Sequence, residues 1–305
     1  MNTNLTRIIV PAALLIGVAS AAFAQAAPDI AEAGRKVVAA AGPAVVTFQM
    51  VIKATISQKG GESNQNESKS EATGVIIDPS GLAVGSLTTF DPSAFVGQMM
   101  DDESMSFRFE VTDLKYLMPD GSEVPGKIVL RDKDQDLVFI RPVTKPETPM
   151  AFVDMKNNAT LDLLDNVVLV GRAGKVMNRA LAARLDRVKA LIEKPRRRYM
   201  LDAAQVGSQT GDIGCPGFTP DGRVVGVELI RFMKGSGDAD SRSSDIRNNT
   251  VAVLVPASDI LVIAAQAPED APKEVAPPAS AVKPAAKPAP KPAPAPKKAA
   301  PAKKK

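Results

Sequence analysis

The sequence GVIIDPSGLAV at residues 74–84 places two apolar runs on either side of a Pro-Ser-Gly turn. In such a turn proline fixes φ, and glycine accepts the positive φ that most residues avoid. The stretch therefore predicts a β-hairpin. Two more turns of this kind are expected at residues 119–121 and 220–222, where the sequence reads PDG.

Short segments rich in Val and Ile recur along the chain and predict further strands. They lie at residues 45–56, 74–77, 107–111, 127–130, 137–140, 167–170, 223–230 and 250–255. Hairpins at this spacing are typical of an all-β sandwich or a pair of barrels. Residues 58–70 are polar without periodicity and predict a mobile loop, and residues 91–106 predict a second long insertion. Residues 180–194 fit a helix or a strand equally well from their pattern alone.

The N-terminus has the features of a secretory signal peptide. Arg7 precedes an apolar run at residues 8–23, and Ala22-Phe23-Ala24 is a small-x-small cleavage site, so we expect a signal over residues 1–24. A transmembrane anchor is the alternative, but spanning needs about 20 apolar residues, more than this run offers. With no transmembrane anchor elsewhere, we expect an exported bacterial protein, either periplasmic or secreted.

The C-terminal end, residues 266–305, is built largely from Lys, Pro and Ala and predicts a disordered tail. Its nine Lys against three acidic residues give about +6, whereas the whole chain carries +4, so the rest is slightly acidic. The tail has two interpretations, a contact for an anionic envelope polymer, lipid or nucleic acid, or a solubilising spacer. Because the folded body is not basic, we expect no specific nucleic-acid binding.

The 305-residue chain contains no His and a single Cys. Without imidazole it has neither a Ser-His-Asp or Cys-His mechanism nor a His-ligated zinc or haem site. The acidic run at residues 132–136 opens like a calcium loop, but Leu137 and Val143 replace the Gly and Glu that an EF-hand requires. We therefore expect no metal and no cofactor.

Three segments resemble, in the same order, those of trypsin-like serine proteases of the bacterial HtrA/Deg type. They are the hairpin at residues 74–84, the sequence PDG at 119–121 followed by DKDQDLV at 132–138, and GDIGCP at 211–216 followed by DGRVVGV at 221–227. The resemblance implies an all-β fold of two Greek-key β-barrels, an N-terminal one over residues 34–148 and a C-terminal one over 149–265. It places the ancestral site between them and favours a strand at residues 188–193.

The resemblance also implies where the catalytic triad would lie. Thr88 stands in the position of the His, Asp136 matches the Asp, and Ile213 stands in the position of the nucleophilic Ser. Threonine has no base that titrates near neutrality and isoleucine has no heteroatom, so we predict no catalytic residues. For Asp136 we expect a structural role, hydrogen-bonded to backbone amides or to Thr88. Gly211 and Gly214 match the oxyanion loop and are candidate binding residues.

The predicted function is that of an exported, catalytically inactive serine endopeptidase homologue, a binding or scaffold module in the cell envelope. Its expected partner is a peptide or an envelope protein held in the cleft. One alternative is an enzyme with a displaced nucleophile, Ser208 or Cys215, and a Lys base, although Cys215 fits a structural role better. Another is an envelope-tethering protein acting through its cationic tail. The sequence KPRRR at 194–198 predicts a solvated turn or a contact for phosphate or an acidic partner.

Overall fold

A computed structural model describes residues 29–59, 61, 63–94, 96, 104–202, 213–232 and 250–269. Its strands form two closed barrels of six antiparallel strands each. The predicted all-β fold of two trypsin-like barrels is therefore confirmed. The expected signal peptide at residues 1–24 and residues 270–305 of the Lys-Pro-Ala tail lie outside the described residues, as do residues 95 and 97–103 of the expected insertion at 91–106.

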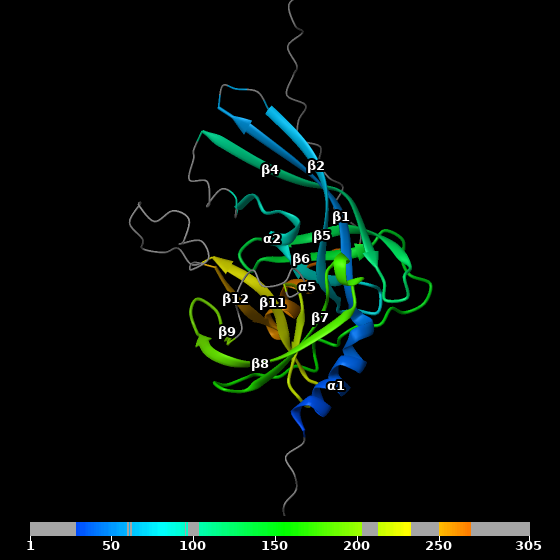
Figure 1. Ribbon diagram of the computed structural model, residues 1–305, viewed down its shortest axis with the longest axis vertical. Coiled ribbons are helices and arrows are strands. Elements are labelled where there is room, and N and C mark those ends of the chain that lie inside the picture. The colour runs from blue at the N-terminus through cyan, green and yellow to red at the C-terminus, as the bar shows by residue number, and fades with distance from the viewer. Residues whose placement is uncertain are drawn as a thin grey trace, which may run out of the picture. The chain divides into compact units, whose positions relative to one another are not determined.

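The first barrel has the Greek-key order β1-β2-β3-β6-β5-β4. Its strands are β1 Val45–Gln58, β2 Ser63–Ile76, β3 Ala83–Ser86, β4 Met105–Leu117, β5 Glu123–Asp132 and β6 Leu137–Pro142. Alternate β1 residues such as Val46, Phe48 and Met50 point into this barrel, as the period of two in a strand requires. β1, β2 and β4 extend together beyond the rest of the barrel (Figure 1).

The second barrel repeats this order as β10-β11-β12-β9-β8-β7. Its strands are β7 Asn166–Arg172, β8 Leu181–Ile192, β9 Arg198–Leu201, β10 Pro216–Phe218, β11 Val224–Phe232 and β12 Thr250–Pro256. The hairpin turns predicted beside β3, β5 and β11 are present, with φ of 91° at Gly81, 85° at Gly121 and 91° at Gly222. These are the left-handed conformations for which glycine was expected.

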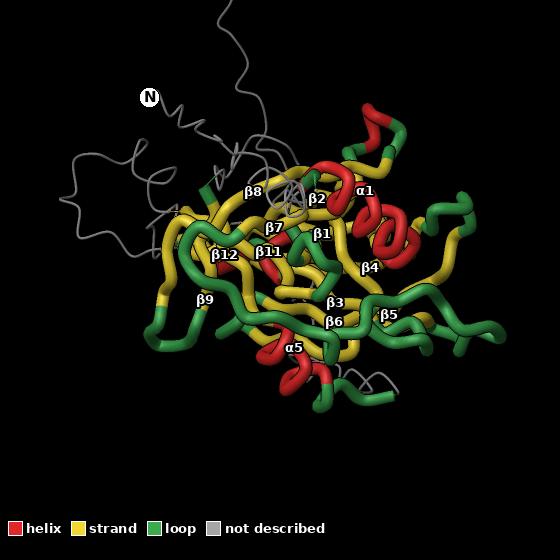
Figure 2. Tube along the Cα trace, turned by 90° about the horizontal axis from the view of Figure 1, so that it is seen from below, coloured by secondary structure: helices red, strands yellow, loops and turns green. Residues whose placement is uncertain are grey.

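Two helices flank the strands on different sides (Figure 2). α1, Ile30–Ala41, begins at Asp29, whose side chain accepts a hydrogen bond from the Ala31 amide, and it buries Val37 and Ala41. α5, Ala257–Ala264, follows β12 and buries Ile260 and Ile263. The other helices are short: α2 at Leu87–Phe90 and 3-10 turns at Gly42–Ala44 and Lys175–Met177.

One apolar cluster joins the two barrels. Residues of the first barrel such as Val75 and Phe139 pack in the same cluster as Val168, Leu229 and Val255 of the second. Each barrel also has its own interior cluster, centred on Phe48 and Tyr116 in the first and on Tyr199 in the second. Because both barrels contribute to this cluster, it sets the position of one barrel relative to the other.

The prediction of a loop over residues 58–70 is wrong for most of that segment, because β2 begins at Ser63. Residues from Ser63 to Ser70 pair in antiparallel register with β1, from Ser63 opposite Ser57 to Ser70 opposite Met50. Pairing through the backbone needs no apolar alternation, and the side chains from Ser63 to Lys69 are exposed. Hydrophobic periodicity therefore gave no signal for this part of the strand.

The ambiguity at residues 180–194 is resolved as a strand. β8 pairs with β7 on one side, with Asn166 opposite Arg187, and with β9 on the other. Leu181 and Leu185, which suggested a helical face, are exposed, whereas Val188 is buried.

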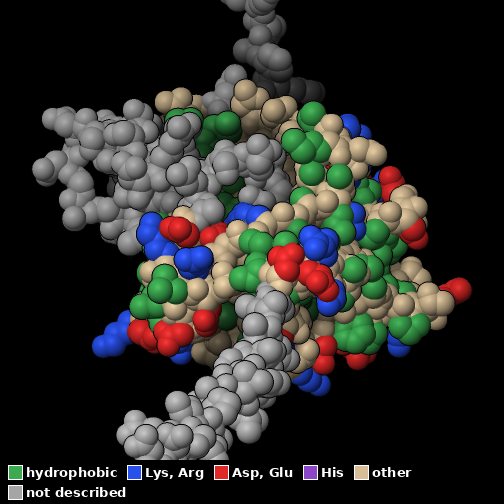
Figure 3. Space-filling view, turned by 60° about the horizontal axis from the view of Figure 1, so that its bottom comes forward, with side chains coloured by type: hydrophobic (Ala, Val, Ile, Leu, Met, Phe, Trp, Pro, Cys, Tyr) green, Lys and Arg blue, Asp and Glu red, His purple; other side chains and the backbone are tan. Residues whose placement is uncertain are grey.

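On the face of the molecule shown in Figure 3, basic and acidic side chains are interspersed. Among the described residues, no helix is long and apolar enough to cross a membrane.

Candidate functional site

Asp136 lies in the tight turn between β5 and β6 and is buried, with a relative exposure of 7%. Its backbone adopts a left-handed φ of 58°, which Asp tolerates better than most residues. The carbonyl oxygen of Asp136 accepts a hydrogen bond from the Leu87 amide at 2.9 Å. The β5–β6 turn and the start of α2 are thereby held together.

The Asp136 carboxylate accepts three hydrogen bonds from the segment joining β3 to α2. One oxygen accepts from Ser86 Oγ at 2.7 Å. The other accepts from the Thr88 amide at 2.7 Å and from Thr88 Oγ1 at 2.8 Å. Thr88 and Asp136, which the sequence resemblance placed in one site, are therefore in direct contact, and the expected hydrogen bond between them is present.

The electrostatic environment of Asp136 combines burial with nearby donors. Burial raises the pKa of its carboxyl group, while hydrogen bonds from Ser86 and Thr88 and the charge of Arg231 act to lower it. Arg231, on β11 of the second barrel, has its own pKa lowered by burial and by the nearby Arg198, against the attraction of Asp136. Both barrels thus contribute charged groups to this region.

Ile213 and Gly214 enter the second barrel just before β10. Ile213 is half-buried, and Gly214 has a φ of 92°. The Gly214 amide donates to the Glu228 carbonyl at 2.7 Å. A Cβ placed at Gly214 would lie 2.0 Å from the carbonyl oxygen of Thr73 on β2, so only glycine allows this approach between the barrels.

The other residues singled out from the sequence either lie outside the described part of the chain, are buried in a barrel interior or form a turn. Gly211 and Ser208 lie outside the described residues. Cys215 is 2% exposed, in the interior cluster of the second barrel. The KPRRR segment forms the β8–β9 turn, where Lys194 and Arg196 are exposed.

Arg198, at the end of that basic segment, is not solvated. It is 5% exposed and forms an ion pair of 2.8 Å with Asp259 of α5. It also donates to the buried side chain of Gln135, the residue before Asp136. Sequence reasoning missed Ser86 and Arg231 and the buried contacts of Arg198, because these contacts join segments that no local pattern connects.

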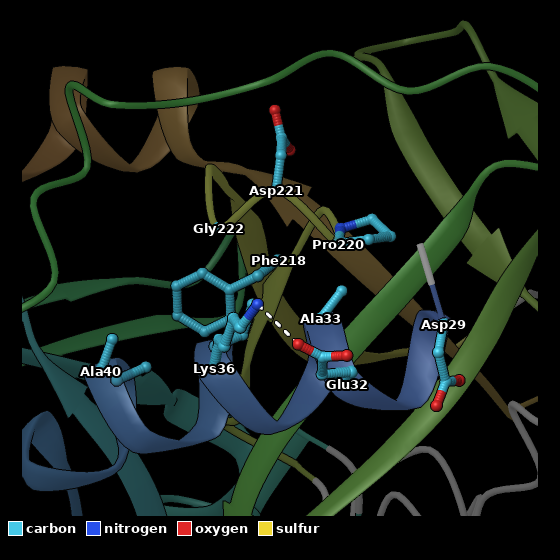
Figure 4. Close-up of a pocket in the computed structure, with 11 residues that line it drawn as sticks. Asp29, Glu32, Ala33, Lys36, Ala40, Phe218, Pro220, Asp221 and Gly222 are labelled. Carbon is cyan, nitrogen blue, oxygen red and sulfur yellow. Dashed lines mark ion pairs between the residues drawn. The ribbon is translucent and has the colours of Figure 1, made fainter. Parts of the chain in front are cut away.

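A pocket of ≈ 630 Å³ lies elsewhere, between α1 and the β10–β11 turn. Figure 4 shows the ring of Phe218 beside Lys36, which forms an ion pair of 2.8 Å with Glu32. None of its lining residues belongs to the triad positions. Among the described residues, no group of three or more acidic or Cys side chains is arranged to hold a metal ion.

The chemistry available around Asp136 consists of hydroxyl groups, a carboxylate and a guanidinium. Ser86 and Thr88 both donate their hydroxyl protons to Asp136, whose carboxylate is a weak base. The whole sequence has no His to serve as one. The arrangement consists of two hydroxyl groups hydrogen-bonded to one carboxylate, with a guanidinium nearby.

Comparison with known proteins identifies a family for this chain and finds solved structures that are similar to it. No curated protein matches this chain. An HtrA-type protease, an AlgW variant with a tripeptide, aligns over 76% of this chain and 62% of its own with 14% identity and a TM-score of 0.48. The MamO protease domain from Magnetospirillum magneticum aligns over 73% of this chain and 97% of its own with 17% identity and a TM-score of 0.43.

The family is shown by the sequence itself. The model of the trypsin-like peptidase domain matches residues 72–227, which is about half of the 305-residue chain. The match begins in β2, runs through Thr88 and Asp136, and ends in β11 beyond Gly214. The chain therefore belongs to the trypsin-like peptidase domain family.

Proposed function

We propose that this protein is a catalytically inactive trypsin-like homologue that acts as a binding or scaffold module in the cell envelope. The observation that carries the proposal is the hydrogen bonding of Asp136. Its two carboxylate oxygens accept from Ser86 Oγ, Thr88 Oγ1 and the Thr88 amide at 2.7–2.8 Å. In a working triad this carboxylate orients an imidazole, and here a threonine occupies the place that the resemblance gives to that imidazole.

The other two requirements of triad chemistry support the same proposal. A general base for a hydroxyl nucleophile must titrate near neutrality, and the chain has no His. The residue in the nucleophile's position, Ile213, has an alkyl side chain that forms no acyl intermediate. Triad members act as a unit, so loss of base and nucleophile together leaves no useful proteolysis.

Export to the envelope rests on the sequence of residues 1–24, with its basic start, apolar run and small-x-small site. In that setting the proposed ligand of the cleft is a peptide or an envelope protein. The tail at residues 266–305 is proposed as a second contact, for an anionic polymer of the envelope.

The proposal is tested by giving the purified full chain to labelled, unfolded casein and to an active-site fluorophosphonate, with trypsin as the positive control. We expect neither cleavage nor labelling. Turnover that survives repurification, and that is lost on Asp136→Ala, would contradict it. Activity lost instead on Ser208→Ala or Cys215→Ala would favour the displaced nucleophile, although Cys215 is buried at 2% exposure.

The contribution of the tail is tested separately by deleting residues 272–305, which contain all nine of its lysines. If the tail tethers the protein, retention on isolated cell wall is lost and the retention of the full chain weakens with salt. Equal retention of both proteins at low salt would assign binding to the barrels.

A further inference from the structure

A second pocket lies on the outer face of the first barrel, where the β7–β8 hairpin packs against β1 and the β4–β5 turn. It encloses ≈ 300 Å³. Its polar lining residues are Thr47, Gln49, Glu123, Arg172, Asn178 and Arg179, and we call it the Arg172 pocket. None of these residues is at a triad position, so a ligand bound in this pocket would be distinct from the proposed ligand of the cleft.

Arg172 carries a positive charge that no acidic side chain in the described part of the chain balances. Its Nε donates to the Val45 carbonyl at 2.9 Å and its Nη2 to the Gly42 carbonyl at 3.0 Å. Among the described residues it has no ion pair, and burial alone lowers its pKa. A guanidinium has five N–H groups, so three remain for a ligand. A half-buried cation without a counter-charge is costly unless an anion joins it.

Thr47 supplies a second, independent sign of a missing partner. It lies on β1, lines the same pocket and is 5% exposed. Its Oγ1 is buried and finds no hydrogen-bond partner among the described residues. A buried hydroxyl left unpaired loses the hydrogen bonds that it made with water, so native structures rarely retain one without a partner.

The other charged residues around the pocket limit the charge of that partner. Arg179 is engaged in a bidentate pair with Glu71, at 3.1 Å and 2.5 Å. Glu123 also lines the pocket and pairs with Lys115 at 3.1 Å. These two carboxylates disfavour a doubly charged phosphate more strongly than a group of single charge.

We propose that the Arg172 pocket binds a carboxylate group, held by the free N–H groups of Arg172 and by the hydroxyl of Thr47. A guanidinium presents parallel N–H groups that match the two oxygens of a carboxylate. The carboxylate comes either from a small organic acid or from the C-terminus of a peptide. The pocket volume of ≈ 300 Å³ admits either source.

Calorimetric titration of the full chain tests the proposal at constant ionic strength. The probes are succinate, an N-acetylated tripeptide with a free C-terminal carboxylate, the same tripeptide amidated, and inorganic phosphate. We expect saturable binding of succinate or of the free tripeptide, which identifies the source, and none of the amidated tripeptide. Phosphate bound more tightly than both carboxylates would overturn the proposal.

Variants assign the binding to this pocket. Arg172→Lys keeps the charge but loses the planar fork, and we expect binding at least about tenfold weaker. Thr47→Val removes the hydroxyl with little change of shape, so we expect weaker binding without loss of thermal stability. The matched control is Arg141→Lys, since Arg141 also donates to a backbone carbonyl, that of Pro268 at 3.0 Å, but lies outside the pocket.

Two further outcomes would overturn the proposal. One is the absence of saturable binding by any carboxylate probe, and the other is equal binding by the wild type and Thr47→Val. Thr47→Val decides the matter if Arg172→Lys does not fold. The casein and fluorophosphonate assays are independent of these titrations, so failure here leaves the proposed loss of catalysis unaffected.

Discussion

At the scale of the residue, the ionisation of Asp136 links the candidate site to stability. Burial raises the pKa of its folded carboxyl group above the unfolded value. Between the two pKa values the folded state binds more protons than the unfolded state, so this residue makes stability fall as pH rises through that interval. The effect is complete once both states are ionised.

Asp136→Asn is expected to remove this decrease of stability with rising pH, because the amide does not ionise. Asn also accepts the left-handed φ of 58° and keeps one oxygen for the donors of Thr88. Urea unfolding across acidic and neutral buffers measures the effect. Asp120→Asn is the control of opposite sign, since hydrogen bonds from Ser122 lower the pKa of Asp120. An unchanged pH slope in Asp136→Asn would contradict the assignment.

Gly214 tests the contact between the second barrel and β2. In Gly214→Ala the new Cβ would lie 2.0 Å from the Thr73 carbonyl oxygen, with the backbone at a φ of 92°. We expect a loss of at least about 3 kcal/mol in the free energy of unfolding, from the clash and the strain together. Gly121→Ala has a similar φ of 85° but nothing within 4 Å, so strain alone, about 1 kcal/mol, is expected there. Equal losses in the two variants would show that the approach to Thr73 is not close.

At the scale of the element, β2 is the strand that the sequence pattern concealed. Its first half pairs with β1 on one side, while its pairing with β3 is confined to Gly74–Ile76. In the described structure alternate amides between Ser63 and Ser70 therefore bond to β1, and the others face away from it. Hydrogen exchange can detect this alternation of bonded and unbonded amides, which a loop would lack.

Hydrogen exchange of the full chain at single-residue resolution is expected to show protection of every second amide between Ser63 and Ser70. β1, paired with β2 on one side and with β4 on the other, is the internal control, and its amides should be protected without alternation. Uniformly fast exchange over Ser63–Ser70 would support the loop predicted from the polar sequence.

At the scale of the whole molecule, Arg198 connects the two barrels. It joins Gln135 in the β5–β6 turn of the first barrel to Asp259 on α5, after the second barrel. Arg198 and Gln135 are both 5% exposed. The connection holds the turn that carries Asp136 against the strand β9.

Arg198→Ala is expected to lower the free energy of unfolding by about 3 kcal/mol, because it leaves a partly buried carboxylate and a buried amide without their donor. Arg198→Lys should not restore stability, since a single ammonium replaces a fork that reaches two partners. The control is Arg223→Ala. The ion pair of Arg223 with Asp221 lies at the surface, so its loss should lower the free energy of unfolding by less than about 1 kcal/mol. Similar losses for Arg198→Ala and Arg223→Ala, measured by urea unfolding, would contradict the role of Arg198.

The sequence by itself determined the strands with apolar patterns and the three turns with glycine at positive φ, because these depend on neighbours along the chain. Family motifs added the positions of Thr88 and Asp136. Tertiary structure alone decided that β2 starts at Ser63, since backbone pairing with β1 needs no apolar signal. It also decided which distant groups meet. Ser86 and Asp136 are 50 residues apart, Gln135 and Arg198 are 63 apart, and Val45 and Arg172 are 127 apart. Such contacts depend on which strands become neighbours when the barrels close, and no local propensity encodes that order.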